Sequence, residues 1–169
     1  MHKFVIAFVS LTLLLFSSNG LSMEKEYAIK AGFLYNFARY GNWLEPHSEP
    51  FFLCSPDADF IAIANGVLSG QKIDGLPISL LAISDNDDNI SQCSLLFITS
   101  STSEFNRINQ YKNIMIVGES EDFINQGGHI RFFLSGGKIR FEVSPEYLKQ
   151  SGITMSSKVL RLGRVVGRQ

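Results

Sequence analysis

The sequence predicts a single α/β domain of three layers, in which helices cover both faces of a mostly parallel sheet with an antiparallel edge hairpin. Three observations lead to this fold class. Short apolar runs alternate with segments of helical periodicity through the middle of the chain, as they do in parallel sheets. The run 94–99 is apolar without alternation, as expected for a central strand buried on both faces. Finally, two alternating runs flank a Gly-Gly pair, which indicates a hairpin.

A long amphipathic helix is expected over 24–43. Its apolar residues recur at spacings of three and four, which places them on one helix face. This face consists of Ile29, Phe33, Phe37 and Tyr40, widened by Leu34 and Tyr35. Gly41 and Asn42, followed by Pro46, mark the end of the helix.

The elements of the first half follow from apolar runs between turns. The expected elements are, in order, a strand at 51–54, a helix at 57–68, a strand at 78–83, an acidic loop at 84–91 and the buried strand at 94–99. The helix is assigned because one face collects Phe60, Ile61, Ile63, Ala64 and Leu68.

The second half is expected to finish the sheet and to end in a helix. In order, the pattern predicts a helix at 103–111 capped by Ser101 or Ser103, a strand at 114–117, a helical turn at 120–125, hairpin strands at 130–134 and 138–143, a helix at 146–150 and a last helix at 156–166. Glycine residues at 127–128, 136–137 and 152 supply the turns between them.

The first 22 residues have the layout of a secretory signal peptide. A short basic start at 1–3 precedes an apolar run at 4–16 and small polar residues at 17–20. Cleavage after Gly20 or after Ser22 fits equally well. A retained anchor is the alternative, but the apolar run is shorter than the roughly 20 residues that cross a bilayer. We therefore expect export to the periplasm, with 23–169 forming one domain.

Composition excludes several classes of protein. The chain has 169 residues, of which 18% are charged and 12% aromatic, unlike disordered, collagenous or coiled-coil sequences. It carries 15 basic and 16 acidic residues, and removal of the signal leaves a charge of about −2 because Lys3 is lost. A general nucleic-acid-binding protein needs a basic surface, so no nucleic-acid partner is expected.

The two cysteines, Cys54 and Cys93, each lie at the edge of an expected strand. In an oxidising compartment a structural disulfide is the favoured state, with free or intermolecular thiols as the alternative. Neither belongs to a Cys-x-x-Cys motif, which disfavours a redox enzyme.

The chain offers little material for a metal site or for catalysis. The acidic run at 85–89 resembles the start of a calcium loop, but Ile90 and Leu96 stand where that loop needs Gly and Glu. After cleavage only His47 and His129 remain, and neither neighbours a cysteine or another histidine. Phosphate-binding, dinucleotide-binding and nucleophile motifs are also missing from the sequence. We therefore expect no metal, no cofactor and no enzymatic activity.

Two segments are candidate binding sites. Ser156, Ser157 and Lys158 begin the expected last helix, where free N–H groups either bind an anion or are simply capped. Arg161, Arg164 and Arg168 are explained by the dipole at the end of that helix.

The hairpin carries charges and an aromatic ring on one face. Alternation places its apolar residues on the core and leaves on the other face Arg131, Phe133, Arg140 and Glu142. An exposed Phe among charges is a candidate contact surface, and a solvated edge is the alternative.

Several motifs, in this order, resemble the YfiR family across nearly the whole mature chain. They are Lys-Ala-Gly-Phe-Leu-Tyr-Asn-Phe-Ala-Arg-Tyr at 30–40 followed by Trp43, the pair Cys54 and Cys93 with Cys-Ser-Leu-Leu-Phe-Ile at 93–98, Gly-Gly-His-Ile at 127–130, Arg-Phe-Glu-Val at 140–143 and Ser-Ser-Lys-Val-Leu-Arg-Leu at 156–162.

The resemblance implies a periplasmic regulator without catalysis. The characterised type binds the periplasmic sensor domain of an inner-membrane diguanylate cyclase and represses it, which lowers cyclic di-GMP and biofilm formation. An outer-membrane, peptidoglycan-binding lipoprotein or reducing stress releases the repressor, and the type forms homodimers. Cys54 and Cys93 would form the family disulfide.

The resemblance also implies a partner-binding surface on the hairpin and the helix after it. Carried over by motif, this surface points to Arg131, Glu142 and Leu148, of which Glu142 keeps the residue type of the family. A second cysteine pair, found in some members near the hairpin, is missing here. Any redox control therefore runs through one bond.

A rival hypothesis is a small-ligand-binding protein of a sensory system. Open α/β sheets bind ligands at the carboxyl ends of their strands, and the expected sheet offers such an edge.

Overall fold

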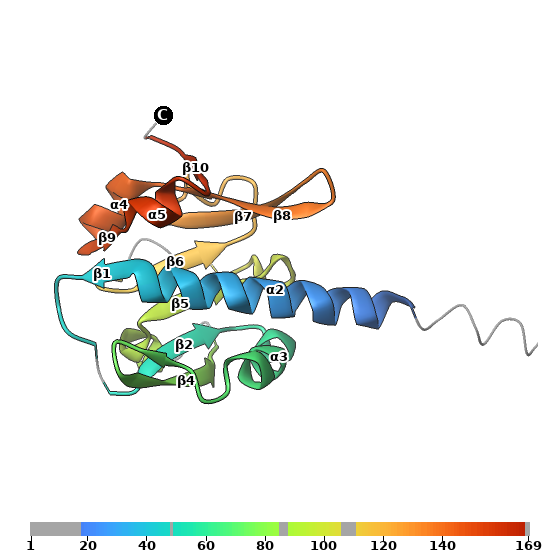
Figure 1. Ribbon diagram of the computed structural model, residues 1–169. Helices are drawn as coiled ribbons and strands as arrows, with labels where there is room; N and C mark the ends of the chain where they lie inside the picture. The colour runs from blue at the N-terminus through green and yellow to red at the C-terminus, as the bar shows by residue number, and fades with distance from the viewer. Residues whose placement is uncertain (1–17, 48, 85–87, 106–110, 168–169) are drawn as a thin grey trace, which may run out of the picture.

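The structure is a computed structural model that describes residues 18–47, 49–84, 88–105 and 111–167 (Figure 1). Within these residues, eight strands form one mixed sheet in the order β10-β8-β7-β6-β5-β2-β4-β3. Their bounds are β2 (Phe51–Ser55), β3 (Lys72–Ile73), β4 (Leu76–Ala82), β5 (Leu95–Ile98), β6 (Met115–Gly118), β7 (Ile130–Ser135), β8 (Lys138–Val143) and β10 (Arg164–Val165). A second, two-stranded sheet pairs β1 (Gly41–Trp43) with β9 (Ile153–Met155).

The centre of the large sheet is parallel. Strands β4, β2, β5, β6 and β7 are neighbours in that order and run in the same direction. This is the doubly wound order 2-1-3-4-5, in which the chain reverses its direction of winding between the first and third strands. Here that switch point lies between β2 and β5.

The antiparallel edge is the expected hairpin of β7 and β8, joined by the two residues Gly136 and Gly137. Both glycines have positive φ angles, 58° and 69°, as a two-residue hairpin turn of this hand requires. Strand β10 then pairs in parallel with the outer side of β8.

The described helices are α2 (Ser18–Tyr40), α3 (Ala58–Leu68), α4 (Pro145–Gln150) and α5 (Ser157–Leu160), with 3₁₀ turns η2 (Asp88–Gln92) and η3 (Ser100–Thr102). Figure 1 shows α2 lying lengthwise across the sheet. Helix α3 begins where the Asp57 carboxylate accepts the Phe60 N–H, and it buries Phe60, Ala64 and Leu68 as predicted.

Two hydrophobic cores lie on opposite faces of the sheet. Alternation within β5 shows this directly, since Leu95 and Phe97 belong to one core and Leu96 and Ile98 to the other. All four are buried, which confirms the prediction of a central strand covered on both faces. The core beneath α2 and α3 holds the aromatic cluster of Phe33, Phe37, Phe60, Phe97, Phe132 and Phe141. The three-layer α/β class is therefore confirmed.

The first helix differs from its prediction in bounds and in buried face. It begins at Ser18 and ends at Tyr40, because Gly41–Trp43 pairs with β9 as a strand. Leu34 and Phe37 are buried as predicted, whereas Ile29 and Tyr40 are exposed. The other buried side chains of the helix were not predicted, and they are Tyr27, Lys30, Ala31 and Ala38. Small Ala side chains let the helix approach its neighbours closely, and a search for large apolar residues overlooks them.

The expected last helix is wrong for most of its length. Helix α5 covers only Ser157–Leu160, and the chain then turns at Gly163 into β10. A side chain at Gly163 would put its Cβ 2.2 Å from the ring of Phe141, so only glycine lets the chain pass so close to β8. The apolar residues at 162, 165 and 166 imitate helical periodicity, but Leu162 and Val165 are exposed.

Smaller differences concern the edges. Strand β4 begins at Leu76, two residues earlier than expected, because it forms an unpredicted short hairpin with β3. The expected turn at 120–125 is present as a series of turns rather than a helix. The helix expected at 103–111 falls largely on 106–110, and the start of the acidic run falls on 85–87, both outside the described residues.

Candidate functional site

Three strands bring an ion cluster together on the hairpin. Glu142 on β8 lies opposite Arg131 on β7 and, on its other side, opposite Arg164 on β10. The Arg131 Nε donates to Glu142 Oε1 at 2.6 Å, and the Arg164 Nε donates to Oε2 at 2.9 Å. A second Arg164 nitrogen, Nη2, also contacts Oε2. Both carboxylate oxygens are thus held by guanidinium groups.

The carboxylate of Glu142 is buried, with 6% of the residue exposed. Burial by itself would raise the pKa of Glu142, but hydrogen bonds from Arg164 and Arg131 outweigh it and lower the pKa below its usual value. Glu142 is therefore ionised at neutral pH. The cluster has one carboxylate for two guanidinium groups, so it presents a net positive charge at this edge.

The ring of Phe133 lies beneath the same two arginines. The guanidinium carbon of Arg164 is 4.8 Å from the ring centroid, and that of Arg131 is 5.4 Å away. Phe133 is consequently half-buried rather than freely exposed. The sequence placed Arg131, Phe133 and Glu142 on one face, and the structure brings them together with Arg164. Arg140 lies opposite Phe133 in the register and is exposed.

Leu148, the remaining residue implied by the resemblance, lies on α4 and is fully buried in the main core. It has no surface to offer a partner in this conformation. Any effect of Leu148 on binding would be indirect, through the position of α4, which packs against β9.

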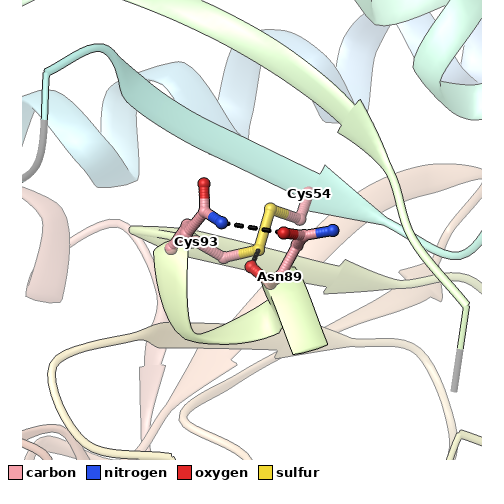
Figure 2. Close-up of a disulfide and its surroundings, with 4 residues drawn as sticks. Cys54, Asn89 and Cys93 are labelled. Atoms are coloured by element: carbon pink, nitrogen blue, oxygen red, sulfur yellow. Dashed lines mark hydrogen bonds between the residues drawn. A yellow bond between two sulfur atoms is a disulfide. The ribbon is translucent and has the colours of Figure 1, made fainter. Parts of the chain in front are cut away.

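The cysteines form the expected bond. Figure 2 shows the disulfide between Cys54 on β2 and Cys93, which follows η2. The two Cα atoms are 5.9 Å apart, within the range that disulfides adopt, and the bond closes a separation of 39 residues. Both residues are buried in the second core, so the bond fastens that layer to the sheet.

At the candidate anion site, residues 156–158, the local structure is a helix N-cap. The Ser156 hydroxyl accepts the N–H of Lys158 as the cap of α5, which is only four residues long. Arg164 lies in β10 and pairs with Glu142, so its assignment to a helix dipole was wrong. Arg168 lies outside the described residues.

A buried polar network, not singled out by the sequence, fills the switch point of the sheet. The Asp57 carboxylate follows β2 and accepts hydrogen bonds from Tyr27 Oη, Thr99 Oγ1 and Ser101 Oγ at 2.7, 2.7 and 2.8 Å. Burial alone would raise the pKa of Asp57, but bonds from the Phe60 N–H and these three hydroxyls lower it to about 2. Tyr27 on α2 thereby occupies the place where doubly wound sheets usually bind a ligand.

A second unpredicted network fixes α2 to the next two strand ends. The Lys30 ammonium is 4% exposed and pairs with both Glu26, one turn earlier, and Glu119 after β6. Glu119 also accepts the Ser100 N–H at 2.7 Å, beyond the end of β5. Sequence reasoning missed Lys30 because it stands within an apolar helix face.

The histidines behave as structural residues. His129 is buried, its Nδ1 accepts the Ile116 N–H at 3.0 Å, and burial together with nearby Lys112 lowers its pKa to about 4. His47 stacks edge-on against Trp43 and Phe51. Among the described residues, no group of acidic, His or Cys side chains is arranged to hold a metal ion. In the same part of the chain, no helix is long and apolar enough to cross a membrane.

Comparison with known proteins gives a family. No curated protein matches the chain. The family model described as YfiR/HmsC-like matches residues 27–164, which include the large sheet up to the first residue of β10 and all of the residues of the hairpin cluster. Because this match covers most of the chain, the protein belongs to the YfiR/HmsC-like family.

Proposed function

We propose that this protein is a non-enzymatic periplasmic regulator that binds the periplasmic sensor domain of an inner-membrane diguanylate cyclase and represses the enzyme. The observation that carries the proposal is the YfiR/HmsC-like match over residues 27–164. The signal-peptide layout of residues 1–22 supports export, and the scarcity of catalytic motifs supports a binding role.

The proposed mechanism is occupancy of the sensor. The repressor binds one conformation of the sensor domain better than the other, and thereby holds the cyclase in a state that does not activate its cytoplasmic domains. Cyclic di-GMP and biofilm formation fall as a result. A peptidoglycan-binding lipoprotein of the outer membrane would compete for the repressor, and a homodimer would be the repressing form.

The hairpin cluster is the proposed contact surface. Arg131 and Arg164 are fixed by Glu142 and cover Phe133, so a positively charged surface with an aromatic ring is organised before a partner arrives. Groups held in place in this way lose little conformational entropy on binding.

Deletion of the gene tests the proposal. Intracellular cyclic di-GMP is expected to rise, and the wild-type chain should restore the original level. A chain without residues 1–22 is the matched control and should fail to restore it, because the repressor would remain in the cytoplasm. An unchanged cyclic di-GMP level under conditions that express the protein would refute the cyclase proposal.

The small-ligand hypothesis receives less support. Tyr27 and its bonds to Asp57 fill the switch point, and the buried hydroxyls there already have partners. A thermal-shift screen with nucleotides and amino acids separates the two hypotheses. A clear rise in melting temperature with one of these compounds would revive the ligand-binding alternative.

A further inference from the structure

A long groove runs between α2 and the β7–β8 hairpin. It consists of two adjoining cavities of about 450 and 470 Å³, which share the lining residues Glu26, Leu134 and Ile139. In Figure 1, the hairpin and the first half of α2 both extend beyond the other strands on the right of the view.

The middle of this groove is apolar and accessible. Leu134 and Ile139 lie directly opposite each other across the hairpin, and Ile29 faces the groove from α2. Leu134 is 68% exposed and Ile29 is 44% exposed, whereas most large apolar side chains of the described sheet are buried. Covering these side chains would remove apolar surface from water and favour binding.

The two ends of the groove differ in charge. One end is lined by Glu119 and Glu121 together with Arg131, whose charge is paired with Glu142, and the other by Lys25 and Lys138 beside Gly137. Lys30 does not cancel the acidic end, because it is buried and bridges two carboxylates, Glu26 and Glu119, which leaves that trio with a net charge of −1. Glu121 adds a further exposed carboxylate, and among the described residues no ion pair with it is found.

We propose that this groove, defined by residues 23–30 of α2, residues 131–139 of the hairpin and the acidic residues 119 and 121, binds a short linear segment of the partner protein. The segment carries one or two apolar side chains between a basic residue, which lies against Glu119 and Glu121, and an acidic residue, which lies against Lys25 and Lys138. The charge order of the groove thus fixes the direction of the bound segment. The inference rests on the proposed function for the identity of the partner.

The walls of the groove are pre-organised. The Lys30 network fastens α2 at the acidic end, and the pair of Arg131 with Glu142 fixes β7 next to it. A segment that enters between two walls held in this way does not have to order them.

The test uses the mature full-length chain and labelled peptides. Overlapping 12-residue peptides covering the periplasmic domains of the membrane-bound diguanylate cyclases of the same cell are titrated by fluorescence polarisation. At least one peptide with the acid–apolar–base pattern is expected to bind. Leu134→Asp should weaken its binding by about tenfold or more, because it puts a charge into the apolar middle. Glu121→Lys and Lys138→Glu should each weaken it by about two- to fivefold.

Matched controls lie away from the groove. Val67→Asp changes an exposed apolar residue on α3, and Lys149→Glu changes an exposed base on α4, so both should bind the peptide like the wild type. Exchanging the acid and the base within the bound peptide should weaken binding to the wild type. It should also partly restore binding to the double variant Glu121→Lys with Lys138→Glu.

The outcomes separate this inference from the proposed function. If no peptide binds, or if Leu134→Asp binds as well as the wild type, the groove is not the docking site, even when deletion raises cyclic di-GMP. If a peptide binds with the expected variant pattern but deletion leaves cyclic di-GMP unchanged, the groove is a docking site and the repressor proposal fails.

Discussion

Glu142 is the residue on which the hairpin surface depends. It is a buried carboxylate between two guanidinium groups, and its replacement leaves both of them without a counter-charge. The sequence placed Glu142 and Arg131 on one face because a strand alternates strictly. The sequence did not predict that Arg164 joins the cluster. Arg164 lies on β10, and the apolar spacing of residues 156–166 predicted a helix there instead.

Glu142→Gln is expected to lower the free energy of unfolding by about 1–3 kcal/mol, since one side of a buried ion pair is removed. Chemical denaturation of wild type and variant measures the change. Glu146→Gln on α4 is the control, because Glu146 is exposed, and it should alter stability by less than about 0.5 kcal/mol. Equal stability of the Glu142→Gln variant and the wild type would show that the cluster contributes nothing to folding.

His129 gives the fold an acid-sensitive residue. Its pKa is about 4 in the folded chain, against about 6.5 in the unfolded chain, so the unfolded state binds the proton more tightly. The contribution of neutral His129 to the free energy of unfolding is complete above about pH 6.5 and is lost as the pH falls toward 4. Its full size is about 3 kcal/mol.

His129→Gln should therefore flatten the stability profile between pH 6.5 and 4.5. The free energy of unfolding of both proteins, measured across this range, checks the prediction. Burial also lowers the pKa of His47, but this contribution is common to both proteins, so the difference between the two profiles isolates His129. Parallel profiles would contradict the assignment of acid sensitivity to His129.

At the scale of elements, the central strands and the helix caps could be predicted from the sequence. The pairing of short edge strands that are distant in sequence could not. The hairpin could be predicted because Gly136 and Gly137, between two alternating runs, indicate a two-residue hairpin turn. The pairs β1 with β9 and β8 with β10 join segments distant in sequence, and two or three residues carry no periodic signal. The Asp57 network was missed for the same reason, since Tyr27 and Thr99 lie 30 and 42 residues away from it.

Two glycines allow opposite predictions at this scale. A Cβ at Gly118, at the end of β6, would lie 2.2 Å from the buried ring of Phe123, whereas a Cβ at Gly66 in α3 meets nothing within 4 Å. Gly118→Ala is expected to destabilise the protein by about 1–3 kcal/mol through overpacking. Gly66→Ala is expected to stabilise it by about 0.5–1 kcal/mol through helix propensity.

Thermal unfolding of the two variants beside the wild type measures both effects. Gly66→Ala is also the control for the general effect of an added methyl group. A melting temperature that rises for both variants would show that β6 and the turn carrying Phe123 are not packed as described.

For the whole molecule, the disulfide joins the sheet to the layer opposite α2. Both cysteines were identified from the sequence, although a thiol state was open until the 5.9 Å separation of their Cα atoms was seen. The family and the fold class were also predictable at this scale, because ordered motifs and alternating elements extend over the whole domain. The groove between α2 and the hairpin could not be predicted, since it depends on how far these two elements extend beyond the rest of the sheet.

Replacement of both cysteines, Cys54→Ser with Cys93→Ser, should lower the free energy of unfolding by roughly 4 kcal/mol in the chain-entropy model for a loop of 39 residues. Denaturation of the double variant and of the wild type, with and without reductant, measures this loss. Reductant should destabilise the wild type and leave the variant unchanged. Full stability of the variant would show that the bond is unimportant for the fold.

Repression by way of the hairpin surface is the central claim, and intracellular cyclic di-GMP tests it most directly. The level is compared in the deletion strain carrying no chain, the wild-type chain or Glu142→Gln, with both proteins at equal periplasmic abundance. The account predicts a raised level without the chain, the original level with the wild type and a raised level with the variant. Equal cyclic di-GMP in all three strains would contradict it.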